Sequence, residues 1–160
     1  MTLIVIATSL SAPKMASFFR GRALDQEARR LLSLTHYGQS RAISEGVPVI
    51  LWIDATARTY GLEIQEGYAY DDPRAVSYEI DRDLTLETTA SEEPPPYEDE
   101  GEVKSTTRRE GIVFLPDGLV DPTSVSRIVV RQGSEDAIAL VSASNGLAYE
   151  LLRENANAAL

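Results

Sequence analysis

The sequence predicts a single domain of the α+β class, in which one long N-terminal α-helix packs on an antiparallel β-sheet head of about seven strands. Apolar residues recur at helical spacing over residues 14–44, whereas the later residues form short segments with a period of two, separated by turn sequences. The chain has 160 residues, of which 43% are hydrophobic, enough for one domain with a substantial core. We therefore expect a helical part at residues 1–45 and a β-rich globular head at residues 46–160.

The first residues form an uncharged run, MTLIVIATSLSA, at positions 1–12. A helix needs about 20 apolar residues to cross a membrane, so this run alone is too short. It also makes a poor secretory signal peptide, because no basic residue precedes it. Pro13 follows at a point where a helix that started at Met1 would be kinked rather than begun.

The helix predicted for residues 14–44 is amphipathic, and Gly46 supplies its C-terminal stop. Its apolar stripe consists of Phe19, Leu24, Ala28, Leu31, Thr35 and Ala42. Phe18 and Phe19 are adjacent, so both cannot face one core, and the outward ring lies either at a subunit interface or in ordinary surface packing. Charged residues at positions 25, 27, 29 and 30 have the spacing of intrahelical ion pairs, which we favour over salt bridges between subunits.

The strands of the head are predicted from apolar alternation and turn residues. Residues 47–53 (VPVILWI) form a near-continuous apolar run, which predicts a central strand covered on both faces. Further strands are expected at 59–65, around 76–80, around 84–86, and at 111–115, 127–131, 137–142 and 147–152. The sequence Asn145-Gly146 favours a tight hairpin turn before the last of them, and residues 155–160 are expected to fray.

Residues 91–110 interrupt the strands with three consecutive prolines and dense charge, which predicts an exposed acidic loop. Its acidic residues, Glu98, Asp99, Glu100 and Glu102, lack the alternating spacing and central glycine of a calcium-binding EF-hand loop. We interpret them as a solvated charge run rather than a calcium site.

Charge is unevenly distributed along the chain, whose formal net charge is -10. Residues 14–45 carry six basic and three acidic side chains, whereas residues 46–160 carry nine basic and 22 acidic ones. A basic helix joined to an acidic head favours contacts between helices and heads of neighbouring subunits. The acidic head disfavours nucleic acid as a partner, because Arg153 is the only basic residue after Arg131.

The residues needed for catalysis or metal binding do not occur in a recognisable arrangement. The chain has no cysteine, which excludes disulfides and thiolate chemistry. His36 is the only histidine and has neither a second ligand nor a nucleophile motif near it in sequence. Glycine-rich phosphate loops are absent as well. We therefore predict no enzyme activity, no cofactor, no metal and no small-molecule substrate.

Three segments resemble the GspH/FimT-type group of type IV pilin-like proteins. Residues 39–49 (QSRAISEGVPV) match the family's pattern at the end of the long helix and the start of the first strand, after an apolar N-terminal helix with a proline partway along. Residues 112–118 (IVFLPDG) match a family strand that ends in a similar turn, and residues 138–146 resemble its closing strand and turn. The sequence departs from the family at Asn145-Gly146-Leu147, where Thr-Gly-Arg is usual, and has no basic leader, Gly-Phe cleavage junction or early glutamate.

The resemblance implies a pilin-like fold and a structural role as a minor pseudopilin of a type II secretion machine or a related type IV pilus-like machine. It implies a single-pass protein of the inner membrane, with the head in the periplasm and other pseudopilins as partners. Alignment of Pro13 with the family's helix proline makes residues 1–12 the remnant of the membrane segment, and we expect its beginning to lie upstream. The residues that the resemblance assigns to the assembly interface of the helix are Leu3, Ile4, Ile6, Leu10, Pro13, Phe18 and Phe19.

Three other functions remain as alternatives. The chain would be a secreted or membrane-anchored β-rich binding module if the same head did not assemble. A variant of this alternative is a FimT-like DNA-binding pilin. The acidic charge of the chain disfavours DNA binding. A small hydrolase would need a catalytic triad, and its parts are missing.

Overall fold

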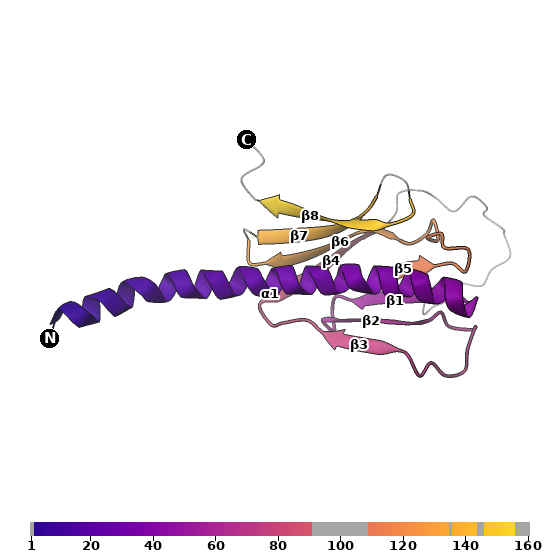
Figure 1. The fold of residues 1–160 in the computed structure, drawn as a ribbon, viewed down its shortest axis with the longest axis horizontal. Coiled ribbons are helices and arrows are strands. Elements are labelled where there is room, and N and C mark those ends of the chain that lie inside the picture. Colours follow the sequence, from indigo (N-terminus) through magenta and orange to yellow (C-terminus); the bar gives the residue numbers. More distant parts are fainter. Residues whose placement is uncertain (1, 91–108, 135, 144–145, 156–160) are drawn as a thin grey trace.

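The N-terminal helix is longer than the head on which it packs. The computed structural model describes residues 2–90, 109–134, 136–143 and 146–155, and the side chains within these ranges from residue 21 to residue 154. Helix α1 spans Thr2–Glu45 and continues through Pro13, and Figure 1 shows its N-terminal part projecting beyond the sheets. The helix ends as predicted, because Gly46 adopts a positive φ of 69° and its amide donates a hydrogen bond of 3.0 Å to the carbonyl oxygen of Ala42.

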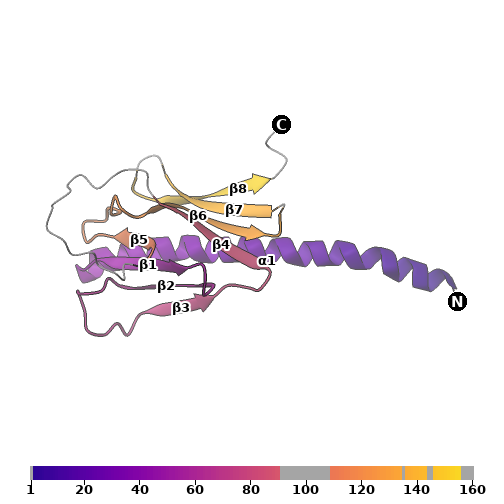
Figure 2. The same ribbon diagram turned by 180° about the vertical axis from the view of Figure 1, so that it is seen from behind.

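The described residues of the head form eight strands, and these are β1 (Val49–Asp54), β2 (Thr59–Ile64), β3 (Val76–Glu79), β4 (Leu84–Ala90), β5 (Gly111–Phe114), β6 (Val125–Gln132), β7 (Asp136–Ser142) and β8 (Tyr149–Asn155). They build two antiparallel four-stranded sheets, in the orders β3-β2-β1-β5 and β4-β6-β7-β8, which we call the β1 sheet and the β6 sheet. The predicted α+β fold is thereby confirmed, and its strands are divided between two sheets. Figures 1 and 2 show α1 running along one side of both sheets.

The core lies between α1 and the inner faces of the two sheets. The helix contributes Leu24, Ala28, Leu31, Leu34 and Ala42, and the sheets contribute large side chains that include Leu51, Leu62, Ile112, Ile128 and Leu140. Burial of each large side chain stabilises the fold by about 1.5–3 kcal/mol. The predicted stripe is confirmed from Leu24 to Ala42, whereas the side chain of Phe19 lies outside the described part of the chain.

Helix and β1 sheet approach closely at Gly38. A Cβ atom added there would lie 2.8 Å from the ring of Phe114 and 2.9 Å from the side chain of Leu62. Real Cβ atoms do not come this close to other carbon atoms, so the packing distance at this point depends on the missing side chain. Glycine in the middle of a helix costs about 1 kcal/mol relative to alanine, and the close packing offsets that cost.

Strand β1 is covered on both faces, as its continuous apolar run predicts. Its inner face joins the core, whereas Ile50 and Trp52 form an outer cluster with Val113. Both cross-strand neighbours of Trp52 are glycines, Gly61 on β2 and Gly111 on β5. A Cβ atom on Gly61 would lie 2.5 Å from the indole ring, so the ring occupies the space that the missing side chain leaves.

Two predicted features fall wholly or partly outside the described residues. Residues 91–108, with Glu98, Asp99, Glu100 and Glu102, belong to the undescribed part of the acidic loop, and only Arg109 and Glu110 at its end are described and exposed. The turn at Asn145-Gly146 is described from Gly146, whose positive φ of 67° suits the predicted tight turn. Strand β8 ends at Asn155, and the remaining residues of the chain are not described.

Candidate assembly surface

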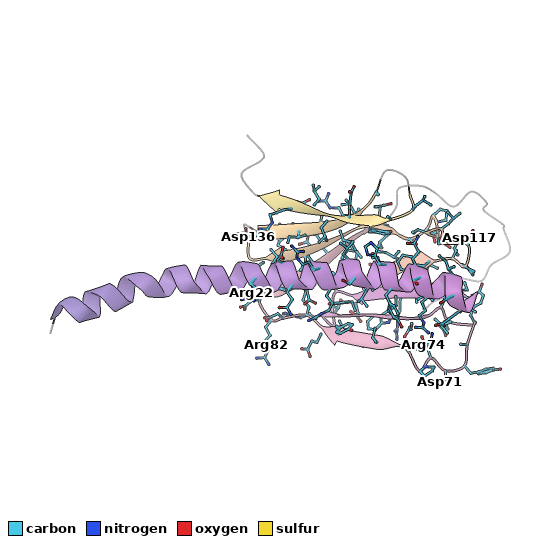
Figure 3. The ribbon with its side chains drawn as sticks, in the orientation of Figure 1. Arg22, Asp71, Arg74, Arg82, Asp117 and Asp136 are labelled. Carbon is cyan, nitrogen blue, oxygen red and sulfur yellow. The ribbon has the colours of Figure 1, made fainter. Side chains whose placement is uncertain are left out.

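The predicted interface residues all lie on the N-terminal part of α1, which projects beyond the head. Figure 3 places Arg22, Arg82 and Asp136 at the end of the head from which the helix projects, which we call the base, and Asp71, Arg74 and Asp117 at the opposite end, the tip. Leu3, Ile4, Ile6, Leu10, Pro13, Phe18 and Phe19 precede the base on the helix backbone, and their side chains lie outside the described part. No helix within the described residues is both long enough and apolar enough to cross a membrane.

At the base, a buried carboxylate connects α1 to the β1 sheet. Glu27 accepts a hydrogen bond of 2.5 Å from the hydroxyl of Tyr60 and one of 3.1 Å from Arg30. The guanidinium of Arg30 also lies 5.1 Å from the centroid of the Tyr78 ring, which itself is 5.6 Å from the ring of Tyr60. Burial and the hydrogen bond to Glu27 raise the pKa of Tyr60, so its phenol remains protonated and donates to Glu27.

Near the tip, a second polar cluster fixes the other end of α1 to the loop between β2 and β3. The side chain of Arg41 is only 2% exposed and donates to Glu45 at 2.8 Å and to Asp72 at 2.5 Å. Arg74 pairs with Glu45 at 2.7 Å, and Asp72 also accepts from the backbone amide of Ile64 at 2.8 Å. One nitrogen of Arg41, Nη1, is buried and has no hydrogen-bond partner among the residues that the structure describes.

These contacts set the charge states of the tip cluster. Hydrogen bonds from Arg41 lower the pKa of Glu45. Burial acts against ionisation of Asp72, but the hydrogen bonds from Arg41 and from backbone amides outweigh it and lower its pKa. Burial likewise opposes the charge on Arg41, and hydrogen bonds to its two carboxylate partners nevertheless raise its pKa. All three side chains are therefore charged at neutral pH.

The opposite flank of α1 is attached to the β6 sheet and to the loops around it. The amide nitrogen of Gln39 donates to the backbone carbonyl oxygens of Gly118 at 2.6 Å and Leu147 at 2.9 Å. Asp25 pairs with Arg153 of β8 at 3.2 Å. Because α1 is held on both flanks and at both ends of the head, it cannot rock on the sheets without breaking polar contacts on one flank.

The surface that α1 turns to solvent is a polar stripe. It consists of Arg22, Gln26, Arg29, Ser33, His36, Tyr37, Ser40, Ile43 and Ser44, all exposed. Arg29 pairs with Asp25 at 2.7 Å, which together with the Glu27 to Arg30 pair confirms the predicted intrahelical ion pairs. The described residues contain no group of three or more His, Cys, Asp or Glu side chains that could hold a metal.

Sequence patterns did not identify Arg41 and Gln39 as the residues that attach the helix to the head. Arg41 is 31 residues from Asp72, and Gln39 is 79 residues from Gly118. Helical periodicity shows which positions lie at the border of the apolar stripe, but it does not show which distant loop a border residue reaches. The sequence signal that could have identified Arg41 and Gln39 is a long polar side chain at the border of a buried stripe.

Comparisons with known proteins agree with this architecture. The profile of a protein family described as "Type II transport protein GspH" matches residues 27–146. Two solved structures of the minor pseudopilin EpsH from the type II secretion system of Vibrio cholerae have similar folds, with TM-scores of 0.55 and 0.53. Each is 12% identical in sequence and covers 84% of this chain, and the match spans 98% and 97% of the EpsH chains. A search of curated protein sequences finds no match.

Proposed function

The chain belongs to the GspH family of type II transport proteins, and we propose that it serves as a structural minor pseudopilin whose helix assembles with other pseudopilins. In this proposal the projecting part of α1 is anchored in the inner membrane and the head lies in the periplasm. The head provides no chemistry, and its function is to present its surfaces to neighbouring subunits.

The observation that carries the proposal is the way in which α1 joins the head. The helix extends beyond the base, and its part within the head is fixed by buried polar clusters at base and tip. A binding module that did not assemble would need the projecting helix only as an anchor, and the orientation of its head on that helix would not have to be fixed. A subunit of a helical fibre needs a fixed orientation, because the position of each head is then set by the packing of the helices.

Charge supports contacts between the stripe of one subunit and the head of another. The exposed stripe includes Arg22 and Arg29, whereas residues 46–160 carry 22 acidic side chains against nine basic ones. Opposite charges on neighbouring subunits bring them together and select the correct register. The polar stripe is therefore the surface on which we expect the head of a neighbouring pseudopilin to lie.

Crosslinking in cells tests the proposal directly. A photoreactive amino acid at Ser33 or Ser40, both on the stripe, should capture other pseudopilins in cells that contain the complete secretion machine. The same probe at Thr85 is the control, because Thr85 is exposed on the outer face of β4, away from the helix. Capture of pseudopilins from the stripe at no higher yield than from Thr85 would refute assembly through the helix.

Substitution of the predicted interface residues tests the projecting part. Ile6→Lys and Leu10→Lys each place a charge on an apolar surface, at a cost of several kcal/mol if that surface is buried in a membrane or fibre. We expect both variants to reduce the membrane-bound fraction and the yield of crosslinks from Ser33. Urea unfolding should be unchanged, because both residues lie on the projecting part of the helix, well before Leu24, the first core residue among the described side chains of α1. Normal membrane retention and normal crosslinking of both variants would exclude these residues from the interface.

A further inference from the structure

The loop between β2 and β3 presents two exposed tyrosines at the tip of the head. Tyr70 is fully exposed and Tyr68 is 58% exposed. The labelled neighbours Asp71 and Arg74 show in Figure 3 that this loop, residues 65–75, lies at the end opposite the projecting helix. We call this segment the tip loop.

The tip loop is anchored although its tyrosines are exposed. Asp72 accepts hydrogen bonds from the backbone amides of Ile64 at 2.8 Å and Arg74 at 3.0 Å, in addition to its contact with buried Arg41. The amide of Tyr68 donates to the carbonyl oxygen of Gln65 at 3.2 Å. These contacts fix the backbone on both sides of the tyrosines, so a partner that binds them has little loop entropy to overcome.

A groove of about 820 Å³ lies beside the tip loop. Tyr70, Ile50 and Ile64 give it apolar walls, and four of its described lining residues are acidic, namely Glu63, Glu66, Asp71 and Asp72. Among the described lining residues the single base is Arg109, which pairs with Glu63 at 3.1 Å. The groove therefore combines an aromatic ring with an excess of negative charge.

This combination suits an arginine or lysine side chain. The ring of Tyr70 can bind the cation through its face, and the carboxylates of Glu66 and Asp71 can pair with its charge. Tyrosine is enriched among the residues that dominate binding energy in protein interfaces, because it gives a large contact area for little side-chain entropy. The head of a second copy of this chain is a poor occupant, since that head is itself strongly acidic.

We propose that the tip loop and its groove bind a basic segment of a different pseudopilin, the subunit next to this one on the tip side. This inference rests on the proposed function, since it requires a neighbouring pseudopilin. It adds to that function a second interface, separate from the helix, which uses Tyr68 and Tyr70 as anchors and Glu66 and Asp71 as charge partners.

The test places a photoreactive amino acid at Tyr70 of the full chain in cells with the complete machine. We expect capture of one other pseudopilin, through a peptide that has arginine or lysine within three or four residues of the crosslinked position. With the probe kept at Tyr70, Glu66→Lys combined with Asp71→Lys should lower the crosslink yield at least fivefold. The matched control is Asp136→Lys combined with Glu150→Lys, which changes the charge equally on the β6 sheet and should leave the yield unchanged.

The remaining outcomes each decide against the inference. Capture of a second copy of this chain, of a protein that is not a pseudopilin, or of a peptide without a basic residue would overturn it. So would equal loss of yield in the double variant and its matched control. If the probe at Tyr70 captures nothing while the probe at Ser33 captures pseudopilins, the tip interface is refuted and the proposed function is retained. If neither probe captures a pseudopilin, both the tip interface and the proposed function are refuted.

Discussion

Substitution of Arg41 by methionine is the most direct way to test how the helix is fixed to the head. Methionine keeps most of the side-chain volume, so the change removes the charge and the hydrogen bonds without leaving a large cavity. Removal of one partner from a buried ion pair costs about 3–5 kcal/mol, because the other charge stays buried without compensation. Asp72 keeps its backbone donors and Glu45 keeps Arg74, so we expect a loss near the lower end, about 3 kcal/mol.

Urea unfolding measures this loss. Trp52 is the only tryptophan of the chain and is buried on the outer face of β1, so its fluorescence reports unfolding of the head. Combination with Asp72→Asn in a double-mutant cycle should give a coupling free energy of about 1.5–3 kcal/mol, as found for residues in one buried network. A loss below about 1 kcal/mol for Arg41→Met, or additive effects in the cycle, would refute the assignment of this cluster as the main polar attachment at the tip.

The same variant has a defined effect on acid stability. The pKa values of Glu45 and Asp72 are lowered in the folded state from their ordinary values of 4.5 and 3.8. The stabilisation that these two carboxylates contribute is therefore complete above the ordinary pKa values, and it is lost as the pH falls through the lowered pKa values of the folded state. Over this window the unfolded chain binds more protons, and stability of the unmodified protein rises with pH. In Arg41→Met the rise should be smaller. If urea titrations gave the same dependence of stability on pH for Arg41→Met as for the unmodified protein, this prediction would be wrong.

Three further substitutions test packing and polar contacts. Gly38→Ala should destabilise the head by about 1–2 kcal/mol in thermal unfolding, since the clash with Phe114 exceeds the gain in helix propensity. The control is Gly21→Ala, where no atom of the described residues lies within 4 Å of the added Cβ, and it should stabilise the head by about 0.5–1 kcal/mol. Equal effects of the two substitutions would show that the close approach at Gly38 is absent. Gln39→Ala should lower the free energy of unfolding by about 1–2 kcal/mol and speed amide hydrogen exchange in the two loops that the Gln39 side chain connects. Unchanged exchange in these loops would show that Gln39 does not connect them. Tyr60→Phe should lower the free energy of unfolding in urea by about 1–3 kcal/mol, because the buried carboxylate of Glu27 loses one hydrogen-bond donor. An unchanged free energy of unfolding would mean that the phenol hydroxyl does not stabilise the base of the head.

The helix and the strands could be predicted because they are local patterns. Helical spacing located the stripe from Leu24 to Ala42, and Gly46 marked the end of α1. The continuous apolar run of β1 predicted that both of its faces are covered, which the clusters around Leu51 and Trp52 confirm. The division into two sheets was not predicted, because alternation indicates which face of a strand is buried but not which strand pairs with which.

The candidate surface was predictable only in its helical part. The apolar run and the resemblance indicated the projecting helix, whose interface residues remain a prediction. The attachment of the helix depended on pairs such as Arg41 with Asp72, which are 31 residues apart and become neighbours only in the folded chain. The exposed Tyr70 carried no periodic signal, because it lies in a loop.

The arrangement of α1 along both sheets determines how the head responds to mechanical load. A pull on the projecting helix acts parallel to the helix axis, and the contacts from Leu24 to Arg41 are spread along that axis. Such a load shears all of these contacts at once, whereas a load across the axis would peel them apart one after another. Side chains of the core and the polar clusters at base and tip therefore share the force, and the head resists a pull along the helix axis better than a pull across it.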